Sequence, residues 1–184
     1  MEGTTKKKQK MKKLLIIAAV ALSAAASQAA SVNWSLNNIQ SSPDTAVGAG
    51  WLVQVYDAST AFSFDAAKEG SITALASGSS IASGTIFKAS GTFGDYAAGA
   101  AVNTYAVVFD AGTVADAKNY IVSDVVNKNI AASGANLNLA FGNMASTATS
   151  NAFHASTWTA VPEPTSGLLL LLGMAGLALK RKRA

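Results

Sequence analysis

TYAVVFD, residues 104–110, is the segment of this 184-residue chain that most strongly predicts a β-strand. Successive side chains of a strand point to opposite faces, so Tyr105, Val107 and Phe109 would share one face. Their β-branched and aromatic character suits a strand that packs in a core. Asp110 follows at the end of the run, where a short acidic side chain can hydrogen-bond the turning backbone. We therefore expect a buried strand that ends at Asp110.

GWLVQVYD, residues 50–57, predicts a second strand of the same kind. Its side chains alternate between two faces, with Trp51, Val53 and Val55 on one and Leu52, Gln54 and Tyr56 on the other. The two strands also continue alike, because VYDAST at 55–60 and VFDAGT at 108–113 share a valine, an aromatic residue, Asp-Ala, a small residue and Thr. This likeness hints at duplicated hairpins or two facing sheets, although two copies are too few for a solenoid.

The remaining strand candidates are short. They are residues 31–36 as an edge strand, 61–65 as a hairpin partner of 50–57, then 85–88, 91–96, 120–126, 136–141 (Leu137, Leu139 and Phe141 inward) and 157–161. Residues 114–126 could instead form a helix, but their β-branched density favours a strand. We expect weak strands or loop at 68–83 and loop at 144–156. About seven to nine short strands separated by Gly, Ser and Asn predict an all-β fold, a small antiparallel β-sandwich, for residues 30–160.

Charge is concentrated at the two ends of the chain. Ten of the fourteen Lys and Arg residues lie in terminal clusters, which leaves residues 30–160 with four lysines against eight acidic residues, a net charge of −4. The basic isoelectric point therefore gives no indication of nucleic-acid binding. The chain has no cysteine, so the domain must hold by packing and cannot form a metal–thiolate site.

The N-terminus has the order of a secretory signal peptide. Six lysines fall within residues 1–13, the apolar run LLIIAAVAL covers 14–22, and small residues follow. Small side chains at positions −3 and −1 place the cleavage between Ala29 and Ala30, with 24–26 as a second possible site. We expect residues 1–29 to be a signal peptide removed by signal peptidase during export; the alternative is an uncleaved anchor.

The C-terminus, VPEPTSGLLLLLGMAGLALKRKRA at 161–184, combines three features in order. Pro162, Glu163 and Pro164 form a stiff, extended step, because proline restricts its own backbone and that of its predecessor. An apolar run to residue 179 follows, and Lys180, Arg181, Lys182 and Arg183 close the chain. We expect a short transmembrane helix at 165–179 with the basic tail 180–184 in the cytoplasm. The alternative is a buried helix of a soluble domain, which a run without a polar face next to four cations disfavours.

This tail resembles the PEP-CTERM sorting signal of Gram-negative envelope proteins. The resemblance covers residues 161–184 only, and its specificity lies in the order of the three features. It implies that Pro162, Glu163 and Pro164 are the motif recognised by exosortase, a membrane protease or transpeptidase, and that Lys180 to Arg183 are the cytoplasmic stop. It also implies an exported protein, first a single-pass inner-membrane intermediate, then located at the cell surface or in an exopolysaccharide and biofilm matrix.

Residues 30–160 offer little recognisable chemistry. His154 is the only histidine, and it lies among small polar residues that indicate a surface position. Asp110 and Asp116 flank a loop that could bind Ca²⁺, but solvated turn acids are the stronger interpretation. Trp51, Trp158 and Tyr56 could stack on sugar rings, although their alternating positions favour the core. We select no catalytic, cofactor-binding or metal-binding residue and expect no cofactor.

The sequence therefore predicts a non-enzymatic structural or interaction component of the surface or the exopolysaccharide matrix. The alternative is a carbohydrate-binding module for that exopolysaccharide. A secreted hydrolase is less favoured, because no catalytic motif stands out.

Overall fold

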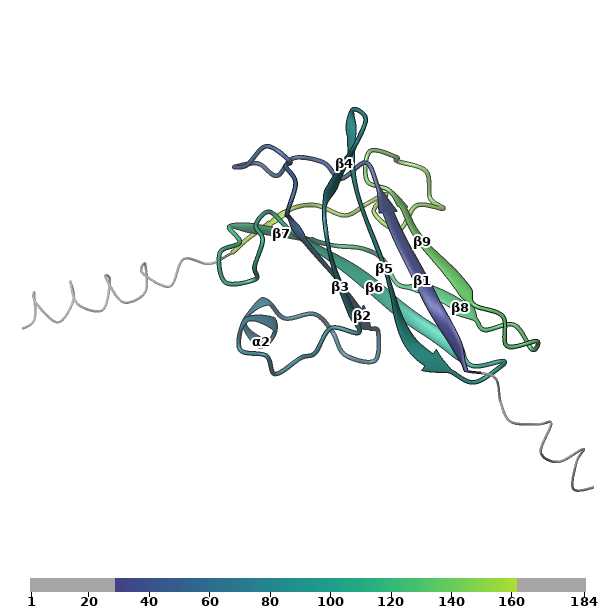
Figure 1. The fold of residues 1–184 in the computed structure, drawn as a ribbon. Helices are drawn as coiled ribbons and strands as arrows, with labels where there is room; N and C mark the ends of the chain where they lie inside the picture. Colours follow the sequence, from purple (N-terminus) through teal and green to yellow (C-terminus); the bar gives the residue numbers. More distant parts are fainter. Residues whose placement is uncertain (1–28, 162–184) are drawn as a thin grey trace, which may run out of the picture.

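The computed structural model describes residues 29–161, which form two β-sheets packed face to face (Figure 1). The elements are β1 (Ala30–Asn37), β2 (Leu52–Asp57), α2 (Phe64–Lys68), β3 (Ala76–Ser79), β4 (Ile81–Ser83), β5 (Ile86–Tyr96), β6 (Ala101–Phe109), β7 (Asn119–Val122), β8 (Val126–Asn129), β9 (Leu137–Asn143) and β10 (Thr159–Ala160). One sheet has the order β4-β5-β1-β9. The other has the order β10-β7-β6-β2-β3, and β8 also pairs with β6. The expected all-β class and the mainly antiparallel pairing are confirmed.

Strand β6 is buried on both faces, as its sequence predicts. Ala106 and Val108 face the core between the sheets, whereas Tyr105, Val107 and Phe109 belong to a second cluster on the outer face of the same sheet. Strand β2 lies antiparallel beside it, with Val53 opposite Val108. Both strands therefore lie in one sheet, and the interpretation of the VYDAST and VFDAGT likeness as two facing sheets is wrong. Because the strands are antiparallel, Asp57 and Asp110 lie at opposite ends of that sheet.

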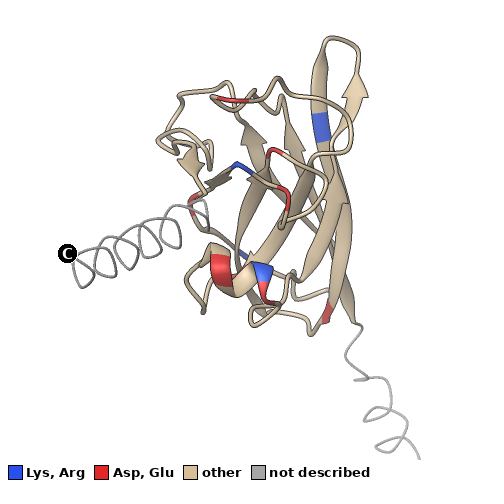
Figure 2. Ribbon diagram, turned by 90° about the vertical axis from the view of Figure 1, so that its left-hand side faces the viewer, with Lys and Arg blue, Asp and Glu red and all other residues tan. Residues whose placement is uncertain are grey.

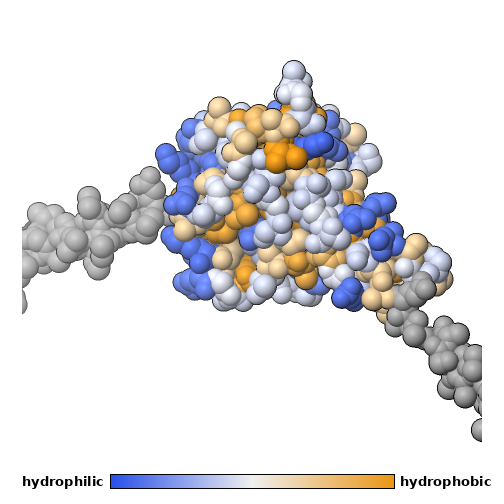
Figure 3. Space-filling view, in the orientation of Figure 1, coloured by the Kyte–Doolittle hydropathy of each residue, from blue (hydrophilic) through white to orange (hydrophobic). Residues whose placement is uncertain are grey.

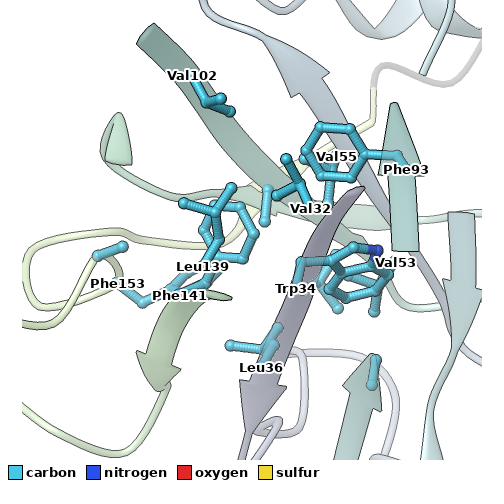
Figure 4. Close-up of a cluster of buried hydrophobic side chains, with 14 of the residues drawn as sticks. Val32, Trp34, Leu36, Val53, Val55, Phe93, Val102, Leu139, Phe141 and Phe153 are labelled. Atoms are coloured by element: carbon cyan, nitrogen blue, oxygen red, sulfur yellow. The ribbon is translucent and has the colours of Figure 1, made fainter. Parts of the chain in front are cut away.

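Strand β1 supplies the centre of the core between the sheets. Val32, Trp34 and Leu36 point inward and meet side chains of β2, β5, β6 and β9 (Figure 4). Trp34 fits only because two glycines leave room for its ring: a Cβ atom at Gly78 or Gly91 would lie 2.9 or 2.7 Å from the indole. Packing at this density leaves no space for an added methyl group.

The strand predicted at 31–36 is present as β1, but its predicted edge position is wrong. Strand β1 lies between β5, which is antiparallel to it, and β9, which is parallel to it. Its alternating Asn and Ser residues mark a face exposed to solvent rather than a missing neighbour. The inward side chains predicted for 136–141 are confirmed in β9, where Leu137, Leu139 and Phe141 pack in the core.

The outer face of the β6 sheet is covered by the segment between β2 and β3, which contains α2. The prediction of a strand at 61–65 is wrong, because Ser63 begins a short helix by accepting a hydrogen bond from the backbone N–H of Ala66. Phe62 and Phe64 still contact the sheet, and both pack near Phe109 and Tyr120. These contacts form the second cluster with Tyr56, Tyr105 and Val107.

The other boundaries differ in detail from those expected. Residues 85–88 and 91–96 join into the single strand β5, residues 120–126 divide between β7 and β8, and β3 and β4 lie within 68–83. Charged residues are scattered over α2, the loops and the strands (Figure 2), and the face in Figure 3 mixes polar and apolar residues.

Candidate sorting site at the last strand

The predicted signal-peptide boundary coincides with the beginning of β1. Ala29 is exposed, whereas Ala30 is fully buried and lies opposite Tyr96 of β5. Cleavage between them would leave every residue of β1 in the domain. The cleavage itself stays a prediction.

The predicted tail residues lie outside the described part of the chain. These are Pro162, Glu163, Pro164, the span 165–179 and Lys180 to Arg183. Within residues 29–161, no helix has the length and apolar character needed to cross a membrane.

Strand β10 connects the domain to this tail. Thr159 and Ala160 lie opposite Tyr120 and Asn119 of β7, at the edge of the sheet. The N–H of Val161 donates to the carbonyl oxygen of Lys118 at 2.8 Å. Thr159 and Ala160 are exposed, and Val161 is half-buried against the second cluster. The backbone is thus held on the sheet up to the residue before Pro162.

The beginning of β7 is fixed by a buried carboxylate. One oxygen of Asp110 accepts hydrogen bonds from the backbone N–H groups of Lys118 and Asn119, both at 2.9 Å. The other accepts from the hydroxyl of Ser42 and the side-chain amide of Asn119, also at 2.9 Å. Asn119 donates in addition to Asp44 at 2.8 Å. Asp110 therefore fixes the backbone of Lys118 and Asn119, the same two residues that bond to Val161 and pair with Ala160.

These bonds also determine how Asp110 titrates. Burial alone would raise the pKa of its carboxyl group, but the hydrogen bonds from Asn119, Ser42 and Lys118 outweigh burial and hold the pKa below its usual value. Asp116, the other acid considered for Ca²⁺, accepts a hydrogen bond from Thr113 of its own turn. No group of three metal-ligating side chains occurs within the described residues. Four hydrogen-bond donors of the protein surround Asp110, so its carboxylate serves to stabilise the fold.

His154 is half-buried, so the predicted surface position is only partly correct. Its Nδ1 atom lies 3.2 Å from a carboxylate oxygen of Asp124 and 2.8 Å from the carbonyl oxygen of Asn151. Asp124 and Asn151 line an open depression of about 510 Å³ together with Lys128. The pair ties the loop after β9 to the turn between β7 and β8.

A smaller pocket of about 220 Å³ lies at the end of β2. Asp57, Thr60 and Ser71 line it beside the rings of Tyr56 and Tyr105, which stack with centroids 5.7 Å apart. The Tyr105 hydroxyl donates to the carbonyl oxygen of Thr60 at 2.9 Å. Burial, together with the neighbouring Tyr105, raises the pKa of Tyr56 to about 12, so both phenols stay protonated at neutral pH.

The aromatic residues considered for sugar stacking belong mostly to the core. Trp51 is 5% exposed and Tyr56 is 3% exposed. Trp158 is half-buried and meets Trp51 edge to face, with centroids 5.8 Å apart. The interpretation of Trp51 and Tyr56 as core residues is confirmed, which leaves neither ring free to stack on a sugar.

The family comparison concerns the segment that begins in β10. Residues 160–183 match the profile described as the PEP-CTERM protein-sorting motif. The chain carries a PEP-CTERM sorting tail. Exosortase, a membrane protease, recognises this motif, so the tail implies an exported, exosortase-sorted protein of the cell envelope or surface. No curated protein and no solved structure matches the chain.

The sequence did not reveal the residues that hold the beginning of the PEP-CTERM tail. The end of the TYAVVFD strand pointed to Asp110 alone. Ser42 lies 68 residues away in the sequence, and Asn119 follows an irregular turn. No local pattern indicates that these residues meet, since only the closure of the sheet brings them together.

Proposed function

We propose that this protein is exported, anchored for a time in the inner membrane and then processed by exosortase at its PEP-CTERM tail. Signal peptidase removes residues 1–29, the span 165–179 crosses the membrane, and Lys180 to Arg183 stay in the cytoplasm. Exosortase recognises Pro162, Glu163 and Pro164 on the outer side. The product is a surface or extracellular protein.

We assign residues 30–160 the role of a non-enzymatic structural or interaction component of the surface or the exopolysaccharide matrix. Supporting this role, the most buried carboxylate, Asp110, is committed to hydrogen bonds within the fold. Both faces of the β6 sheet are covered by the domain's own side chains.

The observation that carries the proposal is the direct connection between the domain and the PEP-CTERM match. The match begins at Ala160, which is the last residue of β10. A folded, cysteine-free domain with a net charge of −4 is thus joined to the sorting motif without a separate linker.

The test is the substitution Glu163→Ala with both prolines kept. We expect membrane insertion to be unchanged, because the apolar span is intact, and we expect mature-size product to disappear. Immunoblotting of membrane and secreted fractions, in cells with and without exosortase, measures the outcome. Glu69→Ala is the matched control, since Glu69 is an exposed glutamate at the end of α2. Mature product at the normal rate from the Glu163 variant would disprove the recognition role of Glu163.

A second candidate role for the domain is binding of the exopolysaccharide. The observation that favours it is the pocket at the end of β2, which is lined by the carboxylate of Asp57, by hydroxyl side chains and by Tyr56 and Tyr105. Asp57→Asn keeps the size of the side chain and its acceptor for the N–H of Ser59. Calorimetric titration of the mature protein with the purified exopolysaccharide should show binding that this variant weakens. Heat changes identical for the parent and the variant would remove the pocket from consideration.

A further inference from the structure

Strand β10 belongs at once to the folded domain and to the sorting segment. The PEP-CTERM match begins at Ala160, whereas the sheet holds the backbone as far as Val161. Two residues of the matched segment are therefore part of the domain. In the folded protein they lie at an edge of the sheet.

An enzyme that reads an extended peptide does so largely through hydrogen bonds to its backbone. The N–H of Val161 is already used, because it donates to the carbonyl oxygen of Lys118. An extended chain covers at most about 3.6 Å per residue, so Pro162 to Pro164 reach only about 11 Å beyond Val161. With β10 in place, Thr159, Ala160 and Val161 are already paired with residues 118–120 of the sheet.

The same structure makes β10 the strand that is easiest to detach. It pairs over two residues, Thr159 and Ala160, and both are exposed. By contrast, β2 pairs with β6 over five residues whose side chains are mostly buried. Release of β10 detaches the exposed Thr159 and Ala160 and the half-buried Val161, and the second cluster keeps its central residues Val107 and Phe109.

We propose that exosortase takes up the backbone of residues 159–161, so that processing requires β10 to leave β7. This inference rests on the proposed sorting function and extends the recognised segment into the domain. It makes the pairing of β10 with β7 a control on the rate of processing. The part of the site that lies in the fold is the backbone of Thr159, Ala160 and Val161.

A disulfide across the strand pair tests the proposal. The chain has no cysteine, and Thr159 lies directly opposite Tyr120, so Thr159→Cys with Tyr120→Cys introduces one possible bond. We expect the oxidised double variant to be exported and to lose its signal peptide, but to accumulate without the mature-size product. Reduction in the same membranes should restore processing to the rate of the single-cysteine variants. Oxidised protein that is processed as fast as reduced protein would overturn the proposal.

A second variant separates release of the strand from other effects of the bond. Six Gly and Ser residues inserted between Val161 and Pro162 in the locked protein supply a free backbone in place of β10. We expect this insertion to restore processing of the oxidised form. If the oxidised form with the insertion remains uncut, the bond acts elsewhere and the proposal is wrong. Failure of the sorting function itself would look different, because the parent chain would then give the same products with and without exosortase.

Discussion

Asp110 is a buried carboxylate whose hydrogen bonds join the end of β6 to the beginning of β7 and to a loop 68 residues away in the sequence. It receives the hydroxyl of Ser42 from the loop before β2 and the N–H groups of Lys118 and Asn119 at the beginning of β7. We expected this acid to bond the backbone that turns directly after its strand, but its backbone donors lie eight and nine residues later, at the beginning of β7. Asp57 does bond its own turn, because it accepts from the N–H of Ser59. The partner in the distant loop could not be predicted, because its approach depends on the whole sheet.

Asp110→Asn should lower the free energy of unfolding by about 2 kcal/mol. The amide keeps one acceptor but presents an NH₂ group to the donors of Ser42 and Asn119, and hydrogen bonds to a charged group contribute about 1.5–3 kcal/mol. Urea unfolding of the domain of residues 30–160 measures the change. Asp116→Asn, at an exposed position of the same connection, is the control and should change stability by less than about 0.5 kcal/mol. Equal effects of both substitutions would contradict the role of Asp110.

The pH dependence of stability follows from the same carboxylate. Its hydrogen bonds hold the pKa of Asp110 below the usual value of about 3.9, so the unfolded chain binds the proton at a higher pH than the folded one does. Its contribution is complete above the unfolded pKa and is lost as the pH falls through the folded pKa. The difference in unfolding free energy between the parent and Asp110→Asn should therefore shrink below about pH 4. A difference that stays constant from pH 7 to pH 3 would contradict this assignment.

At the scale of elements, the sequence predicts strands best where both faces are buried. Strands β2 and β6 lie close to where they were expected, since β-branched and aromatic residues are dense in both. The segment 61–65 misled because Phe62 and Phe64 are spaced as in a strand, yet Ser63 begins a helix between them. Both rings still reach the sheet, so the pattern reported burial correctly but not backbone conformation. The position of β1 between two neighbours was also hidden, since pairing partners leave no mark in a single strand's sequence.

Ser63→Ala should destabilise the domain by about 1 kcal/mol, the usual effect of losing a helix N-cap. The side chain accepts the otherwise unpaired N–H of Ala66 at the beginning of α2. The change in urea midpoint at constant m value gives the magnitude. Ser59→Ala provides the comparison, because the exposed Ser59 takes part in its turn through its backbone N–H. A loss at Ser59 as large as at Ser63 would exclude capping as the cause.

At the scale of the whole molecule, stability is distributed unevenly between the centre and the edges. Residues 104–109 of β6 are all buried, with β2 on one side and both β7 and β8 on the other. Strand β10 is exposed and attached on one side only. The composition of residues 30–160 predicted one cysteine-free, acidic β domain, but the division into a strong centre and a weak last strand depends on strand order, which the sequence does not display.

Hydrogen exchange should rank these strands directly. The amides of Val107 and Val108 should exchange by global unfolding, whereas the amide of Val161 should exchange by local opening and orders of magnitude faster. Mass spectrometry of peptic fragments from the mature protein separates the two regions. Equal protection at both sites would show that β10 opens only with the whole domain.

The parallel pairing of β1 with β9 has a consequence for transit through the membrane. Val32 lies opposite Leu137, 105 residues later in the sequence. When a polypeptide crosses a translocon from its N-terminus, β1 is translocated first. Its partner β9 follows only after most of the remaining chain, so the pairing of the two strands is delayed. Contacts between such distant residues form slowly. The sheet that contains β1 therefore cannot be completed until residue 143, the end of β9, has been translocated. That point comes only sixteen positions before the last strand begins.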